Sequence, residues 1–352
     1  RAALPQTPPA AGALDRAALR HLCQTDLMAL LALLNRNRPN NQLTTSFHGP
    51  ICETFQTTRA RKNLYLVARG TFKTSTITCA GITQRILRAP QRRTLLASNK
   101  AENAQAMLEE IKGYLADPLL LWAFPDILYE EPERQADKWT RSEITVKRPF
   151  RTKEATVETI GVEGELTSKH YDHGTFDDIV GLQNSLTREQ LLNTISWARQ
   201  AESLIDAPDA TFDFVGTPWH YADYWAWLLE RKARHGLELG VYMLPCWVHA
   251  EPGDPAGVDT ADFGRVRATF PERFPVARLL EIREAKGYSE FAAQYLLDPI
   301  SSDTAIFPRA RIRPFIVPRA EMPRADTLWC AMTVDPAIST KKWADEAAIA
   351  VG

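Results

Sequence analysis

A lysine and a threonine stand side by side where their side chains could bind the phosphates of a nucleotide. Residues 64–68 predict a short buried strand, residues 69–72 predict a tight turn, and Lys73 and Thr74 would open a helix. In such a turn, backbone N–H groups surround the phosphates, the lysine reaches the β- and γ-phosphate oxygens, and the hydroxyl binds Mg²⁺. This pattern predicts a site for ATP and Mg²⁺. The expected phosphate-binding residues are Arg69, Gly70, Thr71, Phe72, Lys73 and Thr74.

Two positions near this turn depart from the usual pattern of a phosphate loop. The pattern has glycine directly before the lysine and another glycine five residues before that one, where this chain has Phe72 and Val67. Glycine is favoured there because it adopts positive φ angles and lets phosphates approach closely. On this segment alone, a strand, a turn and a helix with a Lys-Thr pair by chance is an equally good interpretation.

Adjacent carboxylates follow a second strand candidate, at residues 175–178. A nucleotide-hydrolysing site needs a carboxylate near Mg²⁺ and a residue that orients the attacking water, and Asp177 and Asp178 could supply both. The segment 173–176 is unusually polar for a buried central strand. An acidic turn without a metal is the alternative interpretation.

A third segment with possible chemistry follows the strand candidate 211–216. Gly216, Thr217 and Pro218 form a small, polar and rigid turn, and in many nucleotide hydrolases a polar residue at such a strand end senses the γ-phosphate. The alternative is an ordinary turn, because glycine and proline are common there for reasons of φ alone.

The elements that would hold these segments alternate along the chain. Strands that alternate with helices predict a largely parallel sheet with helices on both faces, an α/β fold. The short connection within 142–160 predicts a hairpin, and the composition of 249–264 predicts a long loop. The remaining expected strands are 94–98, 155–160 and 238–243, and the expected helices are 74–88, 100–115, 187–205, 221–234 and 276–296.

The composition sets limits on partners and compartment. The chain has 352 residues and a formal net charge of −1, so any DNA contact would need local basic patches rather than a global basic surplus. Five cysteines without a Cys-x-x-Cys pair argue against a zinc site or a disulfide framework and fit a reducing cytosol. No apolar run approaches the ~20 residues of a membrane span, so we expect no membrane partner.

Taken in order, these segments resemble the large subunit of tailed-phage terminases, the DNA-packaging motor, over about residues 42–352. The deviant turn with Arg-Gly before Lys73 looks like the family's Walker A motif, and residues 166–178 look like its Walker B region. Residues 216–220 are similar to the motif that couples hydrolysis to motion, and residues 332–337 resemble the first hairpin of an RNase H-like nuclease. Further similar stretches are Phe47–His48 with Ile51, 97–104, 139–146, Gln294–Tyr295, 298–299 and 305–307.

The resemblance implies a P-loop NTPase of the additional-strand type, with a mostly parallel sheet flanked by helices. We expect an N-terminal helical lid segment at 1–45, the ATPase core at 46–264, and a lid helix and link at 265–312. Residues 313–352 would be a linker and the beginning of the nuclease domain, which would be incomplete here.

The resemblance also implies roles for individual residues. Thr74 and Asp177 would bind the ATPase Mg²⁺, and Asp178 would orient water where many members have glutamate. Arg69 would contact the γ-phosphate or the neighbouring subunit, and Lys169 stands where the family often has an arginine. Candidates for a finger acting in trans are Lys169, Arg141, Arg148 and Arg151, and the first nuclease ligand would be Asp335, with Asp345 ten residues later.

The implied function is an ATP-hydrolysing motor that moves double-stranded viral DNA into a procapsid, with an endonuclease that cuts concatemeric DNA using Mg²⁺ or Mn²⁺. The implied partners are a portal protein, a small terminase subunit and a homo-oligomeric ring, expected to be a pentamer, in the cytoplasm of a bacterial host. Two alternatives stay open: a helicase-like nucleic-acid-stimulated ATPase, and a degenerate, non-catalytic scaffold, which the unusual Phe72 and Asp178 suggest.

Overall fold

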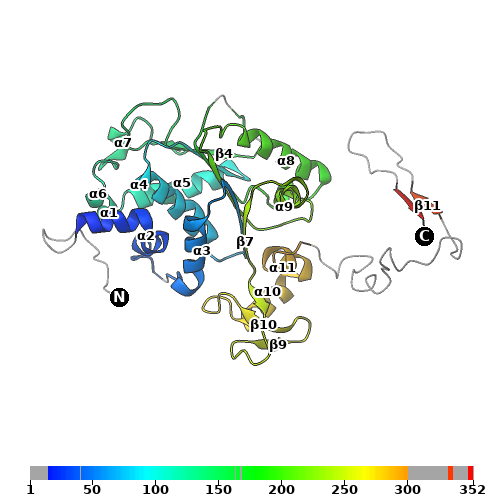
Figure 1. Cartoon of the computed structure of the whole chain (residues 1–352). Helices are drawn as coiled ribbons and strands as arrows, with labels where there is room; N and C mark the ends of the chain where they lie inside the picture. Colours follow the sequence, from blue (N-terminus) through cyan, green and yellow to red (C-terminus); the bar gives the residue numbers. More distant parts are fainter. Residues whose placement is uncertain are drawn as a thin grey trace.

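A mixed α/β unit built on a seven-stranded sheet holds the candidate site (Figure 1). The computed structural model describes residues 15–39, 41–162, 164–166, 169–299, 332–335 and 348–351. The strand order is β3-β4-β2-β5-β6-β1-β7, and every neighbouring pair is parallel except β3 with β4. The strands are β1 (Lys62–Val67), β2 (Thr94–Ser98), β3 (Glu143–Ile144), β4 (Val157–Gly161), β5 (His173–Asp177), β6 (Thr211–Gly216) and β7 (Gly240–Leu244).

The mostly parallel sheet and the β3–β4 hairpin confirm the fold class that the sequence predicts. The central strands are buried on both faces, which explains why β1 and β2 read as continuous apolar runs. Alternate residues of β1 point to opposite layers: Tyr65 and Val67 join one hydrophobic cluster, and Leu64 and Leu66 join another.

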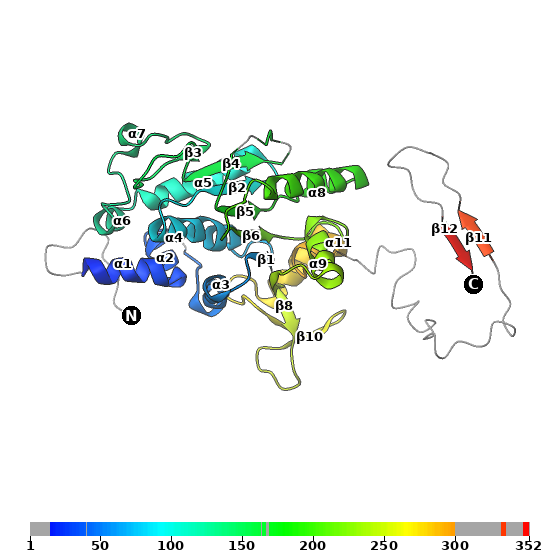
Figure 2. The ribbon, with the colours of Figure 1, turned by 45° about the horizontal axis from the view of Figure 1, so that its top comes forward.

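Helices cover both faces of the sheet (Figure 2). Thr187 caps α8 and forms a capping box with Gln190, at the start of the helix expected at 187–205. The first face carries α1 (Arg16–Thr25), α2 (Leu27–Leu34), α3 (Thr45–Thr57), the π-helix η1 (Thr74–Ala80), α4 (Gly81–Arg88), α5 (Ala101–Leu115) and α6 (Pro118–Ala123), and the second carries α8 (Arg188–Glu202) and α9 (Tyr224–His235). Two short helices, α7 (Pro132–Gln135) and the 3-10 helix η2 (Leu182–Asn184), lie in connections.

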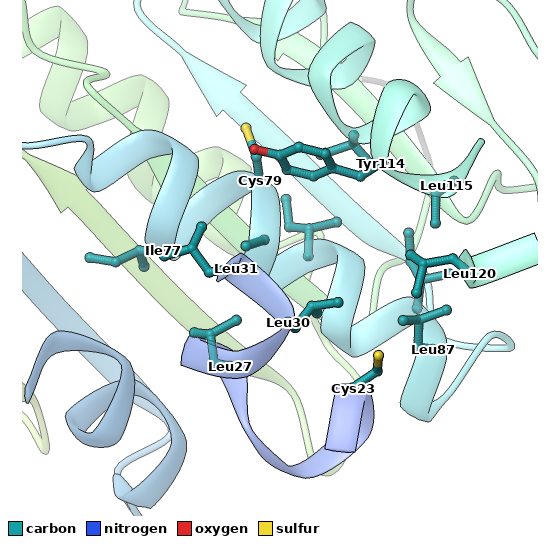
Figure 3. Close-up of a cluster of buried hydrophobic side chains, with 14 of the residues drawn as sticks. Cys23, Leu27, Leu30, Leu31, Ile77, Cys79, Leu87, Tyr114, Leu115 and Leu120 are labelled. Atoms are coloured by element: carbon teal, nitrogen blue, oxygen red, sulfur yellow. The ribbon is translucent and has the colours of Figure 1, made fainter. Parts of the chain in front are cut away.

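The leucine-rich helix α2 fixes the layer behind the phosphate-loop helix. Leu27, Leu30 and Leu31 are fully buried and lie beside Ile77 of η1 and Leu87 of α4 (Figure 3). Full burial of a leucine side chain stabilises a fold by about 1.5–3 kcal/mol. The N-terminal helices therefore anchor η1 from the side opposite the sheet strands.

A smaller unit follows β7 and corrects two expectations. The segment expected as a long loop at 249–264 contains β9. This strand belongs to a three-stranded sheet of order β8-β10-β9, and β8 and β10 lie at the two ends of the segment. The helix expected at 276–296 is two helices, because Gly287 has a φ of +80° and ends the first one. Their bounds are β8 (Trp247–His249), β9 (Val258–Thr260), β10 (Gly264–Ala268), α10 (Val276–Lys286) and α11 (Tyr288–Gln294).

The expected domain boundaries fall beside or within described elements, and the division into domains stays a prediction. The boundary at 45/46 falls at the start of α3, and the boundary at 264/265 falls inside β10. The helices α1 and α2 belong to the cluster on the first face of the main sheet, whereas α10 and α11 pack in a separate cluster with β8 and β10. Phe270 of the segment 265–312 nevertheless belongs to the first-face cluster together with α1 and α2, and a common helical lid stays a prediction.

In the described part of the chain, no single helix is long and apolar enough to cross a membrane; α1 and α2 meet that standard only together, as a pair bent by 111°. Among the same residues the cysteines are free and buried. The C-terminal strands β11 (Met332–Asp335) and β12 (Ala348–Val351) pair antiparallel, with Asp335 opposite Ala348.

Candidate active site

Three neighbouring strands bring the candidate residues to one edge of the sheet. β6 lies between β1 and β5, with Leu66 opposite Gly216 and Asp177 opposite Val215. The carboxyl ends of parallel strands meet at the same edge, which is where ligands bind in open α/β sheets. The segments after β1, β5 and β6 therefore meet although they are far apart in sequence.

The Lys73 side chain joins two of these segments. Its amine is buried and donates a hydrogen bond to Thr217 Oγ1 at 2.9 Å, and it lies 3.4 Å from Asp178 Oδ2. An ammonium has three donors, so this position leaves donor capacity for a phosphate oxygen. Lys73, Asp178 and Thr217, singled out from the sequence, are thus in direct contact.

Asp177 lies at the end of β5 against the helix that begins at Thr74. Thr74 Oγ1 donates to Asp177 Oδ1 at 3.3 Å, and Thr78 Oγ1 donates to Asp177 Oδ2 at 2.5 Å. Burial and the neighbouring charge of Asp178 raise the pKa of Asp177 above its usual range, against the opposing effect of Lys73. Thr78 carries no motif of its own in the sequence, although its spacing of four from Thr74 places both on one side of a helix.

Asp178 adopts a left-handed backbone conformation, with a φ of +44°. Its backbone N–H donates to Val215 O at 2.8 Å, and its Oδ1 accepts from the Thr217 backbone N–H at 3.1 Å. Aspartate tolerates this conformation better than most residues. The end of β6 therefore holds Asp178 in place while its side chain stays 40% exposed.

Two residues of the phosphate loop have positive φ angles, +80° at Gly70 and +61° at Phe72. A bulky side chain at such an angle costs about 1–3 kcal/mol and persists only where neighbours enforce it. The half-buried Phe72 ring packs against the first-face cluster, and the Arg273 guanidinium lies 4.6 Å from its centre. Phe72 thus occupies a glycine position of the usual motif with a glycine-like backbone.

His48 of α3 contacts the phosphate loop through a backbone carbonyl, a contact that the sequence could not show. The Thr44 backbone N–H donates to His48 Nδ1 at 3.0 Å, so the Nε2–H faces the Thr71 carbonyl at 3.2 Å. The ring is fully buried, and burial lowers its pKa below the usual range. The neutral imidazole therefore ties α3 to the middle of the loop.

Arg69 is held by α11 rather than by another loop residue. Its backbone N–H donates to Gln294 O at 3.0 Å, and its Nη1 donates to Gln294 Oε1 at 2.8 Å. Gln294 is buried, and the two residues are 225 positions apart. The described structure thus joins the start of the loop to the link segment.

The structure does not bring Lys169, Arg148 or Arg151 to the edge of the sheet that carries Asp177. Lys169 precedes the amino end of β5 and pairs with Glu158 of β4, so it lies at the opposite edge of the sheet from Asp177. Arg148 donates to Thr152 and Glu154, and Arg151 pairs with Asp137 at 3.0 Å, all close to the β3–β4 hairpin. A role for these residues in trans stays a prediction.

The donor set near Thr74 fits a magnesium ion. Mg²⁺ is commonly bound by one or two carboxylates together with substrate phosphates and water, and Thr74 Oγ1 and Asp177 Oδ1 offer two oxygens 3.3 Å apart. A divalent cation there would favour the charged form of the buried Asp177. Within the described residues no group of three or more His, Cys, Asp or Glu could hold a metal, so the ligand set would depend on the nucleotide.

Asp335 is the last residue of β11, and β11 pairs with β12. The second expected nuclease residue, Asp345, and the expected link residues 305–307 lie outside the described residues. A nuclease site therefore stays a prediction.

A buried polar network explains the polar character of β5. His173 Nδ1 lies 2.7 Å from Thr211 Oγ1, and His173 Nε2 lies 3.0 Å from Thr175 Oγ1 and 3.3 Å from Asp213 Oδ2. Arg85 of α4 donates to Asp213 Oδ2 at 2.5 Å. The polar side chains of β5 and β6 thus contact one another beneath the helix that continues from the phosphate loop, although Asp213 Oδ1 has no hydrogen-bond partner among the described residues.

Burial and the Arg85 charge lower the pKa of His173 to about 4. The Arg85 guanidinium and the His173 hydrogen bond outweigh burial and lower the pKa of Asp213 to about 2. At neutral pH the network therefore contains a neutral imidazole and one ion pair, between the buried Asp213 and the partly exposed Arg85.

No family model and no curated protein sequence matches this chain. Among solved structures, it is similar to an arginine-to-alanine variant of the large terminase ATPase domain of Thermus phage P74-26, with a TM-score of 0.45 and 13% identity over 76% of this chain and 97% of that one. The domain without that change gives a TM-score of 0.43 at the same identity and coverage. A large terminase from a thermophilic bacteriophage, in complex with ADP, gives 0.41 and 8% identity over 78% of this chain and 53% of that one. The chain thus spans about half the length of that ADP-bound terminase.

Proposed function

We propose that this chain is a Mg²⁺-dependent ATPase of the additional-strand class. One observation carries the proposal: the phosphate-loop lysine, the carboxylate pair and Thr217 meet at a single edge of the sheet, with β6 between β1 and β5. An acidic turn or a strand-ending turn present by chance would not require these side chains to contact one another. The geometry therefore favours the catalytic interpretation of each segment over its alternative.

The residues have distinct tasks in this proposal. Lys73 supplies a positive charge to the β- and γ-phosphate oxygens, and Thr74 with Asp177 would hold Mg²⁺, which neutralises developing charge on the phosphates. Asp178, the more exposed of the two carboxylates, orients the attacking water. Thr217 contacts both the Lys73 amine and the Asp178 carboxylate, so it can report the state of the site to α9.

We further propose that the ATPase drives double-stranded DNA into a viral procapsid in a bacterial cytoplasm, as a ring with a portal protein and a small terminase subunit. The order of the motifs from residue 42 to Asp335 supports this assignment. The antiparallel β11–β12 pair with Asp335 at its end agrees with an RNase H-like nuclease that uses Mg²⁺ or Mn²⁺. Arg69 in cis, and Lys169 or Arg141 in trans, are the proposed sources of additional positive charge.

The test is ATP hydrolysis by the wild-type chain and by Lys73→Ala, without DNA, with double-stranded DNA and with single-stranded DNA. We expect Lys73→Ala to abolish turnover, because no other described lysine lies against Asp178 and Thr217. Lys286→Ala removes a lysine of α10 that pairs with Glu290 of α11. This variant is the matched control and should retain activity. Equal hydrolysis by Lys73→Ala and wild type would refute the site, and stimulation by single-stranded DNA alone would favour the helicase-like alternative.

A further inference from the structure

The buried hydroxyl of Thr78 is hydrogen bonded to the carboxylate that would hold the metal. Thr78 lies in the π-helix η1 and is fully buried. Its Oγ1 donates to Asp177 Oδ2 at 2.5 Å, while Asp177 Oδ1 accepts from Thr74 at 3.3 Å. Two threonines of one helix thus divide the two carboxylate oxygens between them.

We propose that Thr78 is a positioning residue that orients Asp177 for the divalent cation, an inference that rests on the proposed ATPase function. The terminal torsion of an aspartate has broad minima, so a carboxylate without a fixed donor can rotate. A hydroxyl bound to Oδ2 restricts that rotation and keeps Oδ1 toward Thr74. Outer partners of this kind tune metal affinity without touching the metal.

The hydroxyl of Thr78 differs from that of another threonine on the same continuous helix. Thr83 Oγ1 donates to the Cys79 carbonyl four residues earlier at 2.8 Å, the usual local bond of a helical threonine. Thr78 instead donates to a side chain 99 residues away. This bond makes the orientation of a β5 residue depend on η1.

Thr76 provides a matched control within the same π-helix. It is fully buried, and its Oγ1 has no hydrogen-bond partner among the described residues. Thr76→Val therefore removes a buried hydroxyl from η1 without touching Asp177. π-helical turns occur frequently at functional sites. A control from the same turn therefore separates the effect of losing the Thr78 hydroxyl from the effect of disturbing the helix.

The experiment is a titration of Mg²⁺ against binding of a fluorescent, non-hydrolysable ATP analogue to the full chain. The variants are Thr78→Val, Thr78→Ala, Thr78→Ser and Thr76→Val, each checked for folding by circular dichroism. We expect the two hydroxyl-free Thr78 variants to raise the half-saturating Mg²⁺ concentration about 10–100-fold, the usual effect of losing an outer partner of a metal ligand. Thr78→Ser, which restores the donor, and Thr76→Val should stay within about twofold of wild type.

The possible results separate this inference from the proposed function. Mg²⁺-dependent binding by wild type with an unchanged Mg²⁺ requirement in Thr78→Val and Thr78→Ala would overturn the role of Thr78 and leave the ATPase proposal standing. Equal shifts in Thr76→Val and Thr78→Val would also overturn it, because the effect would then belong to the helix. Absence of Mg²⁺-dependent binding in wild type would overturn both proposals.

Discussion

Replacing His173 with glutamine should change how the stability of the protein depends on pH. The imidazole is buried at the amino end of β5, and its pKa is lowered from 6.5 to about 4 in the folded protein. Below pH 6.5 the imidazole is protonated in the unfolded chain. In the folded chain it becomes protonated only near pH 4. The wild-type free energy of unfolding therefore contains a contribution that is present above pH 6.5 and is lost as the pH falls toward 4.

The size of this contribution follows from the pKa values. One pKa unit corresponds to about 1.4 kcal/mol, so the His173 contribution should fall by about 2.5 kcal/mol between pH 7.5 and pH 4.5. Glutamine does not titrate, and His173→Gln removes this contribution altogether. The variant also weakens the bonds with Thr211 and Asp213, which lowers its stability at every pH by about 1–3 kcal/mol.

The measurement is urea unfolding of wild type and His173→Gln at several pH values from 7.5 to 4.5, in metal-free buffer. Because other groups titrate in both proteins, the informative quantity is the difference between the two free energies of unfolding at each pH. We expect that difference to move in favour of the variant by about 2.5 kcal/mol as the pH falls. A difference that stays constant over this range would refute the assignment of a neutral, buried imidazole.

Two further substitutions test the edge of the sheet, and a third, in α5, is a control for one of them. Asp178→Asn should retain nucleotide binding and lose hydrolysis, measured by analogue binding and phosphate release; lost binding with unchanged turnover per bound ATP would reverse the roles of the carboxylates. Gly216→Ala should lower the free energy of unfolding by about 1–3 kcal/mol, since the added Cβ would lie 2.5 Å from Trp225 Cζ2. Gly113→Ala, where nothing lies within 4 Å of the added Cβ, should raise it by about 0.5–1 kcal/mol. Thermal and urea unfolding check both, and a tolerated Gly216→Ala would contradict the close packing against Trp225.

The parts of the fold that local sequence determines could be predicted well. The bounds expected for 94–98 and 211–216 are those of β2 and β6, because both are short apolar runs between polar turns. The strand β9 within the expected loop at 249–264, and the strands β8 and β10 at its two ends, could not be predicted. The proline, glycine and aspartate content of this segment indicates turns and gives no signal for the short strands between them.

The candidate site could be predicted only as separate segments. Lys73, Asp177 and Thr217 each carry a local pattern, but the strand order that joins them, with β6 between β1 and β5, could not be predicted from those patterns. The contacts of His48 with Thr71 and of Arg69 with Gln294 carry no such pattern, because they depend on how distant helices pack. The polar residues of β5 looked unfavourable for a central strand until the structure showed their partners on β6 and α4.

The π-helical turn also bears on which changes of chain length this protein could accept during evolution. One continuous helix places Thr78 against Asp177 of β5 and Arg85 against Asp213 of β6, with the change from π to α geometry at Gly81 between them. A helix turns by about 100° per residue. Deletion or insertion of a single residue between Thr78 and Arg85 would rotate one of these contacts away from its strand while the other stayed in place. Homologous sequences that keep both contacts should therefore vary in residue type within this interval while conserving its length.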